Sequence, residues 1–318
     1  MIIRHFKHFV LTATSWALST EDDVLVGGQA VIEGVMMRSP KGYSVAVRRQ
    51  DGTIRIIKDA LQTVGEKWRV FKLPFVRGVG VLGQALVLGI KALKFSAEEA
   101  IEETRPETVP ADETRPEKVS SWLIAGNMVV ALGVNIALLF VLPLFLTRFI
   151  QSQWGFESSL LFNAIDGVFR VGVFVSFLLL VSRMKDMNRV FQYHGAEHKT
   201  VYTFEARESL LVDNAKKYST LHPRCGTSFL MVVMVVSILV FSMSPFVSIY
   251  GRLISRIVLL PLISGISYKV IRYSAKHPGS PLRFVTFPGL LLQKITTKEP
   301  DEPQLETAIR ALQEALTV

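Results

Sequence analysis

The chain has 318 residues, 49% of them hydrophobic, and a mean hydropathy of +0.35, which is high for a soluble protein and low for one wholly embedded in a bilayer. We therefore expect a mainly α membrane protein with about four transmembrane helices, a small N-terminal β-meander and cytoplasmic helices. The net charge of +9 comes from Lys and Arg residues beside the apolar runs, and no zinc-finger, RNP-like or arginine-rich motif accompanies it, so we expect no nucleic-acid partner.

Residues 1–23 form a leader. Arg4 and Lys7 precede a short apolar stretch, Phe9 to Leu18, which resembles the beginning of a signal peptide. We favour a membrane-surface or irregular leader instead, because the charge distribution along the chain places this end in the cytoplasm.

Residues 24–97 predict a cytoplasmic β-meander followed by an amphipathic helix. An apolar stretch with inserted glycines at 24–37, an alternating stretch at 44–49 and the hairpin turn Asp51-Gly52 predict three strands. The helix expected at 75–101 is too short in its apolar part to span a bilayer, and its glycines suit close packing or an interfacial position.

Residues 98–120 predict a flexible acidic linker. Three prolines fall within it, and Glu-Thr-Arg-Pro-Glu occurs at 103–107 and again at 113–117. A segment of this composition buries too little apolar surface to form a core.

Two transmembrane hairpins are expected, at 121–182 and 226–273. Each contains two apolar segments near the ~20 residues that a span needs, and the four segments are Trp122–Leu146, Leu160–Val181, Ser228–Ile249 and Leu253–Ile271. Asp166 and Arg170 stand four residues apart in the second segment, and we expect a neutralised packing pair.

The basic regions decide the topology. The loop at 183–225 and the regions before 121 and after 272 are basic, so the positive-inside rule places all three in the cytoplasm. The protein is then a multi-pass protein with both termini cytoplasmic. The tail at 274–318 ends in an amphipathic helix that Asp301 caps.

The candidate chemistry lies in the 183–225 loop. On a helix, His194 and His198 share one face and could hold one metal ion, while Glu197 could hold a metal-bound water and take its proton. This His-x-x-Glu-His order is the inverted zincin order, with the glutamate as general base. Imidazoles suit a divalent transition metal, with zinc as the first candidate.

A third ligand is needed. His222 is the first candidate because it lies in the same loop beside Pro223, and Cys225, the only cysteine, is the next. Weaker candidates are Glu205, Glu208 and Asp213. The alternative is that the histidines satisfy polar groups at the membrane interface and that Cys225 is a small buried residue.

Further polar residues near these positions are candidates for supporting the metal ligands or contacting a substrate. In the loop they are Gln192, Tyr193, Lys199 and Arg224. The glycine-rich start at 27–38 adds Glu33 and Arg38, for which a surface ion pair at a tight β turn is an equal alternative.

Three long strings resemble the YqhQ-like family of bacterial membrane proteins. They are Gly27 to Arg38, Tyr193 to Lys199 and Ser219 to Ser228, and shorter similarities occur at 256–261 and 288–293. The resemblance covers roughly residues 24–315. It implies a predicted metal-dependent enzyme and, through the bacterial family, the cytoplasmic (inner) membrane as the location.

Two functions remain open. The first is a metal-dependent hydrolase with its site at the cytoplasmic membrane surface. The second is a non-enzymatic membrane scaffold or assembly factor with a structural metal or none. Expected partners are membrane lipids, a cytoplasmic protein and, if the chain oligomerises, further copies of itself.

Overall fold

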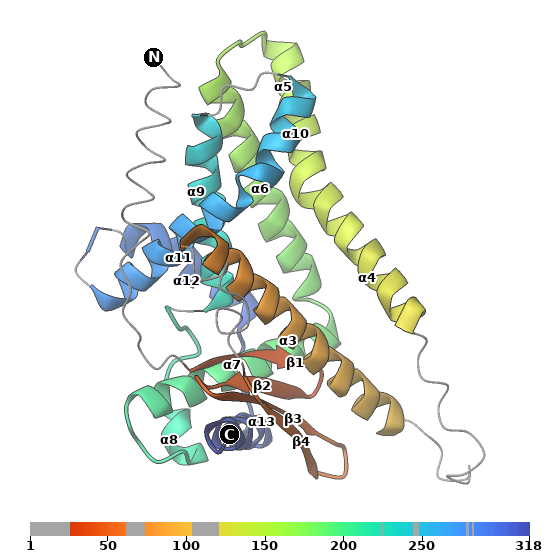
Figure 1. Cartoon of the computed structure of the whole chain (residues 1–318), viewed down its shortest axis with the longest axis vertical. Helices are drawn as coiled ribbons and strands as arrows, with labels where there is room; N and C mark the ends of the chain where they lie inside the picture. The colour runs from red at the N-terminus through yellow and green to blue at the C-terminus, as the bar shows by residue number, and fades with distance from the viewer. Residues whose placement is uncertain are drawn as a thin grey trace.

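The computed structural model describes most of the chain after the leader. The described residues are 26–61, 74–103, 121–223, 225–243, 248–277, 280–281 and 283–318. The leader and Arg224 therefore lie outside them. Figure 1 shows two regions: apolar helices gather in the upper part, and a sheet with helices on both faces fills the lower part.

The sheet is an antiparallel meander with the order β1-β2-β3-β4. Its strands are β1 (Gly27–Val31), β2 (Gly34–Arg38), β3 (Gly42–Arg48) and β4 (Ile54–Ala60). The predicted meander is present, but it has four strands rather than three. The missed turn is Ile32-Glu33, which has none of the usual hairpin-turn residues, and Glu33 takes a left-handed φ of 52° there.

Helices cover both faces of the sheet. Val35, Met37 and Ala46 face α7 (Lys185–Glu205) and α13 (Glu302–Leu316). The alternate residues, with Met36 and Val45 among them, face α3 (Pro74–Glu103), because successive strand residues point to opposite sides. The sheet is therefore a core layer, and α3 continues into the segment that we predicted as linker.

The C-terminal helix begins where the sequence predicted. Asp301 accepts a hydrogen bond from the Gln304 backbone, and the Gln304 side chain accepts one from the Asp301 backbone, which completes a capping box. Leu305 and Leu312 are buried against the sheet. This helix holds the sheet and α7 together from the C-terminal end of the chain.

In the described part of the chain, two helices of the upper region are long and apolar enough to cross a membrane, and a bent pair of helices could form a third span. The helices of this region are α4 (Ser121–Ile136), η2 (Ala137–Val141), α5 (Leu142–Trp154), α6 (Ser159–Val181), α9 (Gly226–Ser242), α10 (Ile249–Val258), α11 (Leu260–Lys276) and α12 (Arg283–Thr296). The short helix α8 (Val212–Lys216) lies in the lower part, beside α7 and α13.

Four spans, which we expected, are not found among the described residues. The first two expected segments correspond to Val129–Trp154 and Ser159–Val181. The third corresponds to α9, whose 17 residues reach only about 26 Å, less than the ~30 Å of a hydrocarbon core. The fourth is bent by 48° between α10 and α11, where Pro261 begins a new helix.

A buried ion cluster joins these apolar helices. Asp166 Oδ2 lies 2.8 Å from Arg170, which confirms the expected pair, and 2.8 Å from Arg256 of α10. Arg256 also donates to the Phe140 carbonyl in the π-helical segment η2. All three charged side chains are buried, so the cluster ties η2, α6 and α10 together.

Candidate metal centre

Helix α7 carries the central motif between the sheet and the apolar helices (Figure 1). Tyr193 and Ala196 are buried in the core against the sheet, which turns the intervening His194 and the following Glu197 and His198 toward α9. The local 3.6-residue period therefore produces the predicted arrangement of two imidazoles and one carboxylate on one side of the helix.

Backbone carbonyls orient both imidazoles. His194 Nδ1 lies 2.8 Å from the Thr296 carbonyl, and His198 Nδ1 contacts the Thr220 carbonyl. A carbonyl only accepts, so each Nδ1 carries the proton and each Nε2 presents a lone pair. Metal-ligating histidines are held in this way in known metal sites.

The buried Nε2 atom of His198 is the clearest indication of a metal-binding position. The residue is only 2% exposed, and its Nε2 has no hydrogen-bond partner among the described residues. A buried nitrogen lone pair without a partner costs free energy unless an ion or a water occupies the position before it.

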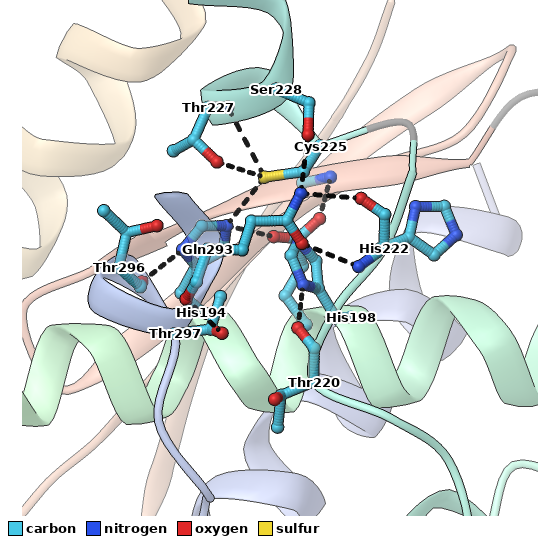
Figure 2. A network of polar contacts seen from close by, with 12 residues as sticks. His194, His198, Thr220, His222, Cys225, Thr227, Ser228, Gln293, Thr296 and Thr297 are labelled. Atoms are coloured by element: carbon cyan, nitrogen blue, oxygen red, sulfur yellow. Dashed lines mark hydrogen bonds and ion pairs between the residues drawn. The ribbon is translucent and has the colours of Figure 1, made fainter. Parts of the chain in front are cut away.

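Cys225 completes a group of three. Its Sγ lies 3.2 Å from His194 Nε2 and accepts a hydrogen bond from the Thr227 backbone N–H at 3.4 Å, which makes Cys225 the N-cap of α9 (Figure 2). The ligand atoms of His194, His198 and Cys225 all lie within 4.8 Å of one another.

These three residues fit a transition metal. Zinc–nitrogen distances of about 2.0–2.1 Å and zinc–sulfur distances of about 2.3 Å place tetrahedral ligand atoms roughly 3.3–3.8 Å apart. The ligand atoms of the three residues lie up to 4.8 Å apart, so small side-chain rotations bring them into that range. Two imidazoles and one thiolate suit zinc better than magnesium or calcium, which prefer oxygen ligands.

Glu197 is fixed by the sheet. Its Oε1 accepts a hydrogen bond from the Gly28 N–H at 2.9 Å, and its Oε2 lies 3.9 Å from His194 Nε2. A Cβ on Gly28 would lie 2.2 Å from the Met36 carbonyl oxygen and 3.2 Å from Glu197 Cγ, so only glycine allows this approach. One carboxylate oxygen is thus held by β1 and the other is directed toward the three ligands.

Gly195 allows a second close approach. A Cβ there would lie 2.1 Å from the Lys298 carbonyl oxygen, and Lys298 donates its N–H to the Phe191 carbonyl. The connection between α12 and α13 therefore crosses α7 at this glycine. This crossing brings the Thr296 carbonyl to His194.

The ligands and Glu197 line a cavity of about 360 Å³. Its other walls come from β1, α7 and the start of α9. The apolar side chains in these walls include Val26, Val190, Val201 and Leu230. The site thus combines a small polar group with apolar walls, as small-molecule and substrate sites commonly do.

His222 lines the same cavity but stands outside the group of three. Its ring centroid lies 5.7 Å from that of His198 and 4.5 Å from that of Tyr202, and its Nε2 lies 3.5 Å from Glu205. Burial lowers the pKa of His222 to about 4, although the charge of Glu197 opposes this shift. The ring is therefore neutral at pH 7.

Gln293 is a supporting residue that we did not single out as a site residue. Its Oε1 accepts from the His222 N–H at 2.7 Å, and its Nε2 donates to the His222 carbonyl at 2.8 Å and to Ser228 Oγ at 2.7 Å (Figure 2). The fully buried amide thereby fixes the loop that carries Cys225. A glutamine directly after an apolar helical run was the available signal.

The other candidates in the loop contact the fold rather than the three ligands. Gln192 accepts from Gln304, and the Lys199 ammonium pairs with Glu299 and donates to the Lys216 carbonyl. These contacts fasten α7 to the C-terminal segment and to α8.

Glu33 forms a bidentate ion pair with Arg189, and the Tyr193 hydroxyl donates to Glu33 at 3.4 Å. Burial and the charge of Glu33 raise the pKa of Tyr193. Burial lowers the pKa of Arg38, which lies in β2. Glu33 therefore takes part in an ion pair, but its partner is Arg189 of α7 and not Arg38 of the glycine-rich start.

Comparison with known proteins gives a family but no activity. The family model described as "Protein of unknown function (DUF1385)" matches residues 73–318. The "Uncharacterized protein YqhQ" of Bacillus subtilis (strain 168) is 33% identical over 293 residues, which cover 91% of this chain and 92% of that protein. No solved structure matches. These matches confirm the resemblance noted from the three sequence strings.

Proposed function

This chain belongs to the DUF1385 family, and we propose from its geometry that it is a metal-dependent hydrolase. In this proposal His194, His198 and Cys225 hold one divalent transition metal, zinc first, and Glu197 is the general base. The observation that carries the proposal is the buried His198 Nε2, which has no partner among the described residues, in a residue that offers a ligand atom within 4.8 Å of those of His194 and Cys225.

Three protein ligands leave a fourth position open, which is the arrangement of catalytic rather than structural zinc sites. A metal bound there polarises a carbonyl or phosphoryl oxygen and lowers the pKa of water. The Gly28 N–H holds Glu197 Oε1, so Oε2 remains to take a proton from the attacking water and to pass it to the leaving group.

The membrane location is part of the proposal. Arg183, Lys185 and Arg189 follow α6 directly, and by the positive-inside rule they support a position of α7 and the metal centre at the cytoplasmic surface of the bacterial inner membrane. Both termini are then cytoplasmic and lipids surround α5 and α6. Reporter fusions at Val318 test this: a cytoplasmic reporter is active, and a reporter that needs export is inactive.

Metal analysis of detergent-purified protein tests the centre itself. We expect about one equivalent of zinc per chain, lost in His198→Ala and in Cys225→Ser. His277→Ala, at an exposed histidine in the C-cap of α11, is the matched control and retains the metal. A protein that neither contains a transition metal nor acquires one on reconstitution rules the proposal out.

A structural metal in a non-enzymatic scaffold is the second candidate. The observation that favours it is the 3.9 Å between Glu197 Oε2 and His194 Nε2, since a small rotation would make Glu197 a fourth ligand and close the site. The Glu197→Gln variant distinguishes the hydrolase from the scaffold. If the protein is a hydrolase, the variant keeps its metal and loses turnover; if Glu197 closes a structural site, the variant binds the metal less tightly.

A further inference from the structure

We propose that the cavity binds an extended polypeptide segment, which adds as a strand to the free edge of β1 with a peptide carbonyl directed at the metal centre. The cleavage of that segment rests on the proposed hydrolase function, but its binding does not. The argument comes from the register of β1, from the exposure of its edge and from the walls of the cavity.

The register shows which backbone groups of β1 face the cavity. Val31 and Gly34 flank the two-residue turn and exchange ladder hydrogen bonds, so the next residue, Ala30, points its N–H and C=O away from β2. Gly28, two residues before Ala30, likewise directs its N–H and C=O away from β2. The observed bond from the Gly28 N–H to Glu197 confirms this direction independently.

The outward groups of β1 therefore form one side of the metal centre. Glu197 touches Gly28 at one carboxylate oxygen and approaches His194 Nε2 with the other, so the edge and the ligands are separated by a single side chain. Among the described residues no partner is found for the Ala30 N–H or for the Gly28 and Ala30 carbonyls, which are directed away from β2 and can pair with an incoming chain. No strand pairs with this edge within the described ranges.

The backbone of β1 is accessible to a bound chain along its outer edge. Gly28 is exposed, Gly27 and Ala30 are half-buried, and a Cβ built on Gly27 has no neighbour within 4 Å. Bare sheet edges invite pairing with another chain, and glycines in strands mark places where another backbone approaches. Two successive glycines beside the ligands fit such an approach better than they fit strand stability.

The cavity walls suit the side chains of a strand. Val26 and Val201 lie in the cavity wall beside the edge but are almost fully buried in the core, so the apolar surface open to a side chain is that of Leu230, which is 46% exposed and continues onto the apolar outside of α9. Main-chain pairing with pockets for alternate side chains is how edge strands recognise peptides. The continuity with α9 favours an apolar segment at the boundary of the membrane.

Cleavage of the bound segment balances with water as the only co-reactant. The water oxygen bonds to the carbonyl carbon, and Glu197 takes one water proton. The carbon–nitrogen bond then breaks, and Glu197 returns the proton to the leaving nitrogen. The products are a carboxylic acid, which keeps the second water proton, and an amine; at neutral pH that proton passes to the amine, which gives a carboxylate and an ammonium group.

The test measures binding rather than turnover. Zinc-loaded Glu197→Gln protein is mixed with a pool of random decapeptides, and retained peptides are identified by mass spectrometry after gel filtration. The best-retained peptide is then N-methylated at each position in turn. We expect affinity to fall about tenfold at alternate positions only, because a paired strand directs every second N–H to its neighbour.

Two variants examine the edge itself. Ala30→Pro removes the outward N–H but no ladder bond, and we expect an affinity loss of about tenfold with unchanged zinc content. Ala30→Ser keeps the N–H and serves as the control. The N-methyl series stands on its own if Ala30→Pro does not fold.

Each other outcome has a meaning. No retained peptide, or N-methyl effects without alternation, overturns the inference, as does displacement of every peptide by phosphatidylglycerol vesicles that the wild-type protein hydrolyses. Alternating N-methyl effects in a protein that cleaves nothing support the inference and overturn the proposed function. Cleavage of a soluble ester without peptide binding does the reverse.

Discussion

Replacing Gln293 with alanine should weaken the metal centre without removing any ligand. The side chain accepts from the His222 N–H and donates to the His222 C=O, which also accepts from the Cys225 N–H at 3.2 Å. The variant therefore takes the partner from one buried donor, the His222 N–H, at a cost of about 1–3 kcal/mol, and it removes a second hydrogen bond worth about 1 kcal/mol. Water from the adjoining cavity can replace part of the loss, so we expect about 2–3 kcal/mol.

The second effect of Gln293→Ala is on zinc affinity. The loop from His222 to Cys225 loses its anchor on α12, and residues that orient metal ligands typically change metal affinity by about 10–100-fold. Competition with a chromophoric chelator measures the affinity, and thermal unfolding of the apo and zinc-saturated protein measures the stability. Gln313→Ala, at a half-exposed position on α13, is the control.

The result that refutes this reasoning is specific. If Gln293→Ala binds zinc as tightly as the wild type and its apo form unfolds at the same temperature, Gln293 does not position the Cys225 loop. If stability falls but zinc affinity does not, the loop is held by the metal centre itself, and the role assigned to Gln293 is only structural.

Three further predictions follow from the described contacts. Gly28→Ala should displace β1 or Glu197, because its Cβ would meet the Met36 carbonyl at 2.2 Å, and we expect a stability loss of about 1–3 kcal/mol and lower turnover in thermal and kinetic assays. Asp166→Asn should destabilise the detergent-solubilised protein by about 3–5 kcal/mol, because Arg170 and Arg256 lose their shared carboxylate; an unchanged unfolding temperature would contradict this. Removing zinc with a chelator should lower the unfolding temperature, and added zinc should restore it in the wild type but not in Cys225→Ser.

The features that the sequence predicted well are local. His194, Glu197 and His198 share one side of α7 because the helical period alone brings them together. Asp301 and Gln304 form their capping box within a single turn, and the Asp51-Gly52 turn likewise depends on neighbouring residues.

The features that escaped prediction depend on contacts between distant segments. The carbonyls of Thr220 and Thr296 orient the histidines, but a backbone group has no signature in the sequence. The choice between His222 and Cys225 beside the two histidines depends on how the loop before α9 folds over α7, and the structure brings Cys225 closer.

The expected membrane segments are found in part, as two helices that could span and a bent pair, and the difference from four has another reason. Hydropathy reports composition, whereas a span also needs length and a continuous axis. The apolar run after Cys225 ends as a 17-residue helix, and the run around Pro261 is divided by the proline. The buried Asp166 was expected to have one partner and has a second, Arg256, because α10 returns to α6.

Cys225 has two roles: it is a candidate metal ligand and the N-cap residue of α9. The same sulfur atom would therefore coordinate the ion and accept the hydrogen bond that begins the first turn of α9. Since α9 runs from the sheet layer into the apolar region, a change in ionic occupancy at the cavity would reach the apolar helices as a change in the order of that turn. Binding of the metal and anchoring of the apolar helices to the sheet then become a single linked equilibrium.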